Sequence, residues 1–219
     1  MKKVILTLLL IVGISPAFAQ SVKFGVSGGL NESILSLQNT INNDNSRLAG
    51  FHAGIFSDID FGKVSIEPGL FYTTKGQNNK SFIAAPVGAT FTANGKVTYN
   101  YLELPINILY NIPVGAGKFF IGGGPYVAYG LSGTSKGTTT ENSNGTVTTS
   151  TDDYKLAFGG QDGDLKRIDF GLGALGGFAL KDGLSISAGY EHGLTNIENS
   201  GIDKTKNNVI SVSLGYCFL

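Results

Sequence analysis

The amino-acid sequence predicts an all-β fold, an eight-stranded antiparallel transmembrane up-and-down β-barrel with long extracellular loops and short periplasmic turns. The chain of 219 residues contains 32 Gly, 14 Phe and 9 Tyr but no Trp, which favours strands and tight interiors over helices. Segments compatible with strands are separated by connections that alternate between long and short. Within several segments, apolar and polar residues alternate with a period of two, the spacing of a strand with two different faces.

The eight expected strands follow one another along the chain. They are residues 22–30, 48–57, 63–74, 98–110, 118–131, 166–180, 184–193 and 208–218. The connections 31–47, 75–97, 132–165 and 194–207 are long, and the three between them are short. Long loops at one end and tight turns at the other, with both termini on the side of the turns, are typical of outer-membrane barrels.

The segment 98–110 shows the alternation most clearly. Its even positions from Leu102 to Tyr110 are apolar or amphipathic, whereas the odd positions include Glu103 and Asn107. A run of about ten such residues fits a strand that crosses a bilayer with its oily side toward lipid. A soluble lipocalin-like barrel would turn the same apolar side inward. Because charged residues and glycines share the polar face, a narrow polar lumen is the favoured interpretation.

The charged residues of the polar face are the candidate site residues, and we expect them to form a structural network in the lumen. They are Lys23, His52, Glu67, Glu103, Arg167, Asp169 and Glu191. Glu67 and Glu103 fall on neighbouring strands and are expected to help close the lumen, because carboxylates enclosed there need partners. No residue pattern indicates a catalytic centre, a metal site, a cofactor or a particular ligand.

Aromatic side chains near the strand ends of the oily face are expected to form girdles at the membrane interfaces. These side chains are Tyr72, Tyr110, Phe119, Tyr129, Phe178 and Tyr190. Three prolines, Pro68, Pro105 and Pro125, lie inside expected strands, where each removes a hydrogen bond from the ladder or marks a bulge. We therefore expect local irregularity at these positions.

The connection 132–165 is dominated by Ser, Thr, Asn and Gly. Such a segment buries too little apolar area to order itself, so it is expected to be a mobile external loop. A loop that folds on a binding partner is the alternative.

The first residues predict export. Met1–Ala19 has a basic start, an apolar run and a small-x-small end, which is typical of a secretory signal peptide. Residues 20–219 would then form the barrel domain. No later run of about eighteen apolar residues could span a membrane as a helix, so a chain residing in the bilayer must be a closed barrel. Cys217 is the only cysteine, and no internal disulfide is expected.

Two classes of function are disfavoured. The chain has 16 basic and 16 acidic side chains, so it lacks the positive field that attracts nucleic acid. The run Gly171-x-Gly173-x-x-Gly176 matches a dinucleotide-binding fingerprint, but a turn at 181–183 leaves no room for the helix that the fingerprint requires. Glycines that ease close packing in a small barrel explain this run better.

Four segments carry a resemblance to a known family. They are YLELPINILY at 101–110, GGGPYVAYGLSG at 122–133, KRIDFGLGALGGF at 166–178 and AGYEHGLTNI at 188–197. In this order they resemble the PorT-like outer-membrane β-barrel proteins of Bacteroidetes. The resemblance implies an eight-stranded barrel delivered to the outer membrane, and the founding member is implicated in protein export through the type IX secretion system.

The leading functional expectation is an integral outer-membrane protein without enzymatic activity, which has a structural or binding role through its external loops. One alternative is an accessory component of a protein secretion system. Another is a lumenal enzyme that modifies lipid or sugar, whose activity would depend on His52 or Glu103. The expected partners are outer-membrane lipid, the barrel assembly machinery during biogenesis and, in the first alternative, secretion-system proteins.

Overall fold

The computed structural model describes residues 21–37, 44–84, 89–143, 145–159, 165–199 and 204–218, which form nine strands. The strands are β1 (Ser21–Leu37), β2 (Asp44–Asp60), β3 (Val64–Ala84), β4 (Thr90–Val114), β5 (Gly117–Ser143), β6 (Thr146–Leu156), β7 (Ile168–Leu180), β8 (Leu184–Gly193) and β9 (Thr205–Cys217). No helix with the length and hydrophobicity to cross a membrane occurs in these ranges. The expected signal peptide, residues 1–19, lies outside the described residues.

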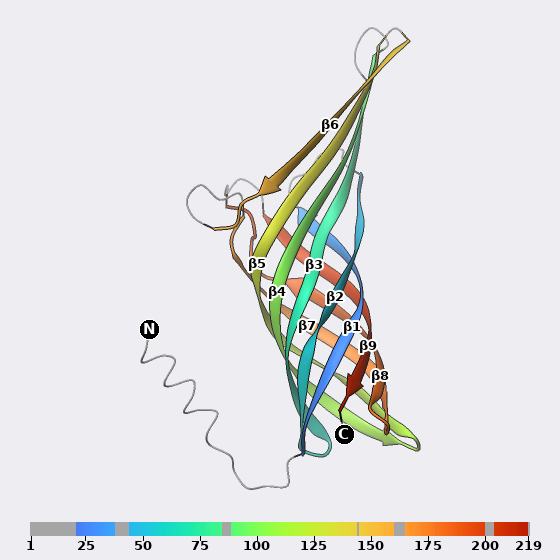
Figure 1. Ribbon diagram of the computed structural model, residues 1–219, viewed down its shortest axis with the longest axis vertical. Coiled ribbons are helices and arrows are strands. Elements are labelled where there is room, and N and C mark those ends of the chain that lie inside the picture. Colours follow the sequence, from blue (N-terminus) through green and yellow to red (C-terminus); the bar gives the residue numbers. More distant parts are fainter. Residues whose placement is uncertain are drawn as a thin grey trace.

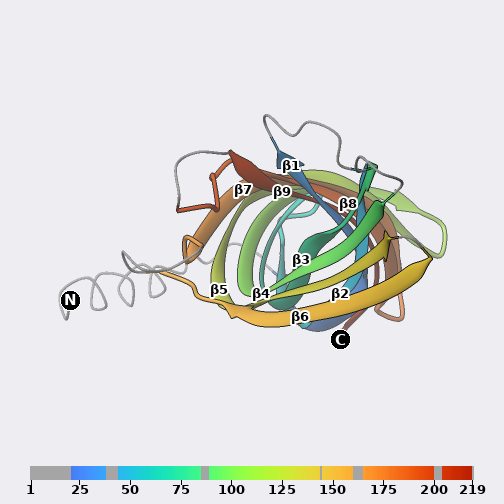
Figure 2. The ribbon, with the colours of Figure 1, turned by 90° about the horizontal axis from the view of Figure 1, so that it is seen from above.

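Eight of the strands close into a ring. The order is β4-β3-β2-β1-β9-β8-β7-β5, and an additional pairing between β5 and β4 closes it. All pairings between these strands are antiparallel. Figure 2 shows the strands curving around a common centre, with β6 at the outer rim. The prediction of an eight-stranded antiparallel up-and-down barrel is therefore confirmed, and β6 is an addition to it.

The two faces of each ring strand are oriented as expected. Leu104 and Ile106 of β4 are 45% and 42% exposed on the outside of the ring, whereas Glu103, which directly precedes Leu104, is 4% exposed on the inside. The expected girdle residues also face outward, and the rings of the paired residues Phe119 and Phe178 meet there with centroids 4.7 Å apart and planes tilted by 56°. An exterior of this kind is suited to lipid, because a soluble protein would expose a large apolar surface to water.

Three ring strands continue far beyond the ring. The β3–β4 pairing extends to Ala84 and Thr90, and the β4–β5 pairing extends to Thr90 and Asn142. The upper half of β5 pairs on its other side with β6. Figure 1 shows the resulting sheet rising above the barrel. We call this part of β3, β4 and β5, together with β6, the projecting sheet.

The projecting sheet overturns the expectation of a mobile loop over 132–165. Residues 132–143 belong to β5 and residues 146–156 form β6. This segment needs no apolar core, because its threonines favour strands and its backbone is paired in ladders between β4 and β5 and between β5 and β6, apart from the outer edge of β6. For the same reason the expected strands 63–74 and 98–110 were too short.

The ladders are interrupted locally at the three prolines, as expected. Cα pairing between β3 and β4 breaks next to Pro68 and Pro105 and resumes in the same register, and Pro125 is paired with Leu172 of β7 but falls in a gap of the β4–β5 ladder. Register shifts occur elsewhere, between Arg47 and His52 of β2 and between Asn100 and Tyr101 of β4. The second shift lies where the ring passes into the projecting sheet.

Candidate functional site in the lumen

An ion cluster crosses the middle of the lumen. Lys75 of β3 places its Nζ 2.6 Å from Oε2 of Glu103 on β4 and 3.0 Å from Oε2 of Glu191 on β8. The Lys75 side chain is fully enclosed, and its Nζ also lies 4.2 Å from the centroid of the Tyr126 ring. Two carboxylates and an aromatic face thus compensate a cation that is removed from water.

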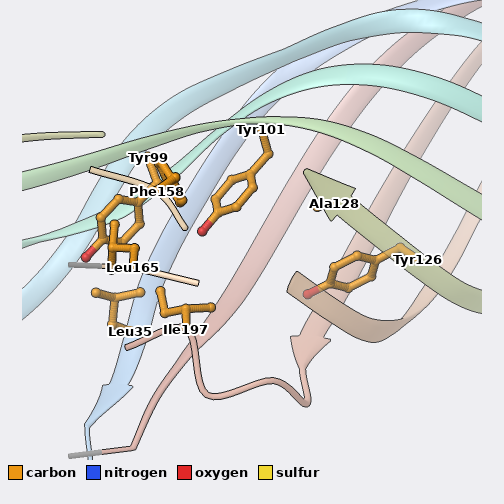
Figure 3. Packing of buried hydrophobic residues seen from close by; sticks show 8 residues of the cluster. All are labelled: Leu35, Tyr99, Tyr101, Tyr126, Ala128, Phe158, Leu165 and Ile197. Atoms are coloured by element: carbon orange, nitrogen blue, oxygen red, sulfur yellow. The ribbon is translucent and has the colours of Figure 1, made fainter. Parts of the chain in front are cut away.

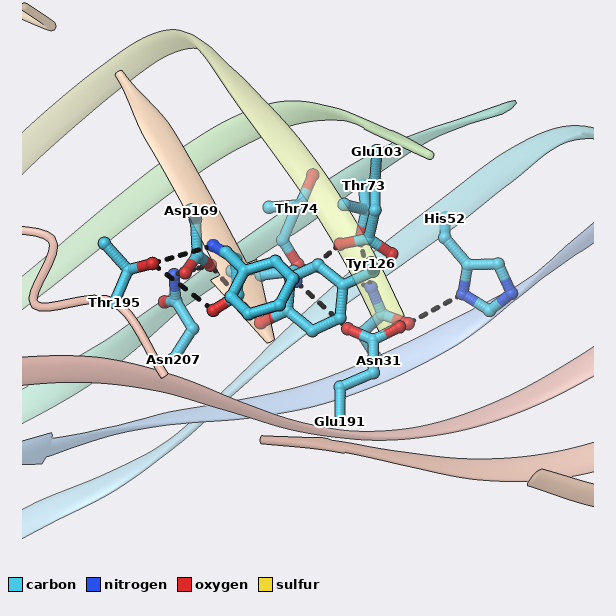
Figure 4. Close-up of polar contacts among 12 residues, drawn as sticks. Asn31, His52, Thr73, Thr74, Glu103, Tyr126, Asp169, Glu191, Thr195 and Asn207 are labelled. Carbon is cyan, nitrogen blue, oxygen red and sulfur yellow. Dashed lines mark hydrogen bonds and ion pairs between the residues drawn. The ribbon is translucent and has the colours of Figure 1, made fainter. Parts of the chain in front are cut away.

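A second polar group adjoins this cluster. Asp169 of β7 is fully buried, and its Oδ2 accepts hydrogen bonds from Asn207 Nδ2 at 2.8 Å and from the Tyr126 hydroxyl at 3.4 Å. Tyr126 therefore contacts Lys75 with its ring and Asp169 with its hydroxyl group. Figure 4 shows the side chains of Glu103, Tyr126, Asp169 and Glu191 close together in the lumen. These contacts connect strands on opposite sides of the ring, so they close the lumen and brace the barrel against flattening.

A hydrogen-bonded row that includes the histidine lies on another part of the wall. His52 Nδ1 is 2.7 Å from Asn31 Oδ1, and His52 Nε2 is 2.9 Å from Ser213 Oγ. Asn31 Nδ2 in turn donates to Thr73 Oγ1 at 2.9 Å. An amide and a hydroxyl group thus hold both ring nitrogens of His52.

An apolar cluster fills the lumen toward the end of the long connections. It comprises Leu35, Tyr99, Tyr101, Tyr126, Ala128, Phe158, Leu165 and Ile197 (Figure 3). Phe158, Leu165 and Ile197 come from the segments between strands, so the chain folds back over the barrel mouth. Phe158 makes edge contacts with Tyr99 and Tyr101, at centroid distances of 6.3 and 5.7 Å. The lumen is thus closed twice, by apolar packing and by the ion cluster beneath it.

Two cavities lie on the other side of the ion cluster. One, of about 130 Å³, is lined by residues that include His52, Glu103 and Ser213. The other, of about 340 Å³, lies toward the short turns, where Lys118 pairs with Asp58 at 3.2 Å. The two cavities share four wall residues, Phe56, Glu67, Phe120 and Ser185. The two cavities therefore adjoin each other between the ion cluster and the short-turn end.

The sequence matches one family of proteins, described as an outer membrane protein beta-barrel domain, over residues 18–199. The chain belongs to this family. Membership implies an outer-membrane location for this outer-membrane β-barrel. No curated protein matches the sequence.

The chain is also similar to solved structures of other bacterial proteins. OprG of Pseudomonas aeruginosa is 15% identical and aligns with a TM-score of 0.44, over 91% of this chain and 97% of that one. Ail, the attachment invasion locus protein of Yersinia pestis, is 14% identical with a TM-score of 0.42, over 90% and 98%. Neisserial surface protein A is 14% identical with a TM-score of 0.38, over 90% and 99%.

The barrel brings together some of the residues expected in its lumenal network and separates others. Glu103 and Glu191 meet at Lys75, and Asp169 lies beside them through Tyr126. His52 belongs to the separate row described above. Glu67 lines both cavities and Lys23 lines the lower one, so these two residues lie below the ion cluster.

The assignment of Arg167 to the lumen is corrected. Arg167 is exposed, donates hydrogen bonds to the Phe158 carbonyl and the Tyr129 hydroxyl, and stacks 5.3 Å from the centroid of the Tyr129 ring. The period-two alternation predicted a lumenal Arg167 because the expected strand began at residue 166. Since β7 begins at Ile168, the inside-outside rule does not extend to Arg167.

Sequence reasoning missed the cation at the centre of the site. Lys75 was assigned to a long loop because the expected strand ended at residue 74. The alternation in fact continues, with Phe71, Thr73, Lys75 and Gln77 on the inner face of β3. Two features of the sequence could have revealed this cation. Three carboxylates enclosed in a lumen require a cation, and Lys75 lies an even number of residues after Glu67, so an extended strand places both side chains on the same face.

Proposed function

We propose that this outer-membrane barrel is non-conducting and that its outer end is a binding component without enzymatic activity of its own. The observation that carries the proposal is the free edge of the projecting sheet. Strand β6 pairs with β5 and with no other described strand, and every residue of Thr146–Lys155 is exposed. An unpaired edge presents a row of backbone N–H and C=O groups, which is a template for the addition of a further strand.

The position of this edge supports a role outside the cell. The projecting sheet rises from the end that carries the long connections, and in outer-membrane barrels that end is extracellular. Its strands continue directly into the ring, so a partner bound to β6 would be held at a fixed height above the membrane. The closed lumen supports the same role, because eight strands packed with side chains leave no aqueous channel.

Site-specific photocrosslinking tests the proposal. A photoreactive amino acid at Thr149 on β6 is expected to give a discrete adduct in native envelopes, whereas the same group at Ile121, on the outer wall of β5, is expected to give none with that partner. Thr149→Pro should abolish an adduct formed from a neighbouring position, Thr151, because proline disrupts the strand. An adduct that survives this substitution, or no adduct at either β6 position, would refute binding at the edge.

As a second candidate we propose an accessory role in protein secretion, which the resemblance of the four segments to PorT-like proteins supports. Deleting the gene and comparing proteins inside the envelope with those released to the medium tests this role. Retention of exported cargo that the wild-type chain reverses, but a chain lacking residues 146–156 does not, would link secretion to the projecting sheet. Unchanged release would exclude this candidate.

We also propose that Met1–Ala19 is removed during export. N-terminal sequencing of the protein extracted from outer membranes should begin at Gln20. A mature chain that retains Lys2 and Lys3 would contradict this.

A further inference from the structure

His52, Gly29 and Ser213 lie in one row across three neighbouring strands. Gly29 of β1 pairs with His52 of β2 on one side and with Ser213 of β9 on the other. Neighbouring strands are about 4.8 Å apart, so the backbones of His52 and Ser213 are separated by roughly 10 Å. The imidazole spans this distance because Gly29 has no side chain: a Cβ there would come within 2.8 Å of His52 Cε1. His52 Nε2 thereby reaches Ser213 Oγ at 2.9 Å.

The hydrogen bonds of Asn31 determine which imidazole nitrogen carries the proton. Asn31 Nδ2 lies 3.4 Å from the carbonyl oxygen of Thr74, which can only accept, so the amide nitrogen is on that side. The Asn31 Oδ1 atom is therefore the group 2.7 Å from His52 Nδ1, and it accepts a hydrogen bond from Nδ1–H. Nε2 then has a free lone pair, and the hydroxyl of Ser213 donates to it.

This is the arrangement of an activated nucleophile. A hydroxyl donates to a neutral imidazole, and a third group fixes the tautomer and the orientation of the ring. An amide oxygen can serve as this third group, since the orienting residue need not be charged.

The three side chains line the cavity of about 130 Å³. Ser187 of β8 pairs directly with Ser213, and Ser211 lies two residues away on the same face, so two further hydroxyl groups adjoin the nucleophile. They are the donors available to a developing oxyanion, because the backbone N–H groups here belong to the ladders. The cavity adjoins the larger one near the short turns at their four shared wall residues, and this is the side from which a small molecule and water would enter.

We propose that Ser213 is the nucleophile of a lumenal esterase site, with His52 as general base and Asn31 as its positioning residue, for esters of short-chain carboxylic acids. Ser213 Oγ attacks the ester carbonyl carbon while its proton passes to His52 Nε2. The tetrahedral intermediate collapses, the ester C–O bond breaks, and the leaving alkoxide takes the proton from His52. Water then attacks the acyl-serine with the same base, which releases the carboxylic acid and restores Ser213.

The size of the cavity sets the substrate class. The ion cluster and the apolar cluster block the space above, so a long acyl chain has no room beyond the serine, whereas a short acyl group fits. Glu103 is bound to Lys75 and takes no part. This inference goes beyond the external binding role and is independent of it, since the site lies in the ring and not in the projecting sheet. It also departs from the expectation of a barrel without enzymatic activity.

A fluorophosphonate probe tests the nucleophile on the full-length folded barrel in detergent. The wild-type chain is expected to form one adduct, in which a P–O bond replaces the P–F bond, and peptide mapping should place it on Ser213. This mapping requires no variant to fold. No adduct, or an adduct on another residue, would overturn the proposal.

Variants test the base. Ser213→Ala should abolish labelling, and His52→Gln, which can still hydrogen-bond, should slow it by roughly 10²-fold or more. The matched control is Ser150→Ala, an exposed serine of β6 outside the lumen, which should label at the wild-type rate. The rates of p-nitrophenyl acetate hydrolysis should rank these chains in the same order as the labelling rates. Equal labelling of His52→Gln and wild type would refute a general base.

The positioning role of Asn31 is tested by the pH dependence of labelling, which a purely structural residue would not change. Asn31→Leu should remove the sigmoidal pH dependence of labelling that a titrating imidazole base produces, and Asn31→Asp should restore it, because Asp again offers an acceptor to Nδ1–H. A pH profile that is the same in all three chains would refute the positioning role. Heated and unheated electrophoretic mobility should confirm that each variant is folded.

Discussion

The ring and the projecting sheet are built from the same strands but are stabilised differently. In the ring, β4 alternates between lipid-facing Leu104 and lumenal Glu103, and side chains from opposite walls meet. In the projecting sheet, β6 is exposed on both faces, and its ladder with β5 is its main support. The comparison shows that backbone pairing can extend a sheet into water, whereas closing it into a barrel requires contacts across the lumen.

The transition between the two regions has a structural marker. The register of β4 against β5 shifts between Asn100 and Tyr101, at the level of the apolar cluster. Such a bulge bends a strand and increases its twist. The bulge therefore separates strand portions that curve around the lumen from portions that leave it.

The largest expected difference in stability is between losing an ion pair in the ring and losing one in the projecting sheet. Lys75→Ala leaves Glu103 and Glu191 enclosed without their cation, and should lower the free energy of unfolding by about 3–5 kcal/mol. Lys136→Ala removes the pair with Asp153 in the projecting sheet, where the side chains are 60% and 56% exposed, and should cost less than about 1 kcal/mol. Denaturant unfolding in lipid vesicles measures both. Equal losses would show that the ion cluster does not brace the ring.

The next effect concerns the outer faces. Leu104→Lys places a charge among lipid chains and should destabilise the barrel by about 2–4 kcal/mol. Thr149→Lys, on the exposed strand β6, should change stability by no more than about 0.5 kcal/mol. The same vesicle experiment applies. If Leu104→Lys were tolerated as well as Thr149→Lys, the outward face of β4 would not contact lipid.

A smaller effect separates the two carboxylates that were expected to close the lumen together. Glu103→Gln weakens a charged hydrogen bond to Lys75 and should lower stability by about 1–3 kcal/mol. Glu67→Gln lies below the cluster and should change it by less than about 0.5 kcal/mol. The temperature at which the folded, faster-migrating band disappears reports both. Neither variant should conduct in planar bilayers, because the apolar cluster remains in place.

The smallest expected difference is in the hydrogen-exchange rates of the unmutated protein. Amide hydrogen exchange should be faster in β6 than in the ring portion of β4, because β6 opens without disrupting a buried core. Mass spectrometry of peptides from residues 146–156 and 101–112 measures the difference. Equal protection would indicate that the projecting sheet has a partner covering its free edge.

Much of the ring was predictable because the alternation of side chains is a local property of an extended chain. The alternation in residues 101–110 separated Leu104 from Glu103, the charged residues and glycines that share the face of Glu103 assigned that face to the lumen, and the pattern of long and short connections indicated eight strands. The alternation rule mispredicted the position of Arg167, because it holds only within a strand and β7 begins at Ile168, the residue after Arg167.

The sequence by itself determined the barrel, its apolar exterior and its charged interior, because the period-two alternation of side chains and the order of the segments can be read directly from it. Only the tertiary structure decided how far the strands extend, that Lys75 joins Glu103 and Glu191, and that His52 reaches Ser213 across Gly29. These features depend on which residues face one another across neighbouring strands and across the lumen. Such distances arise from register and closure, which no stretch of sequence contains alone.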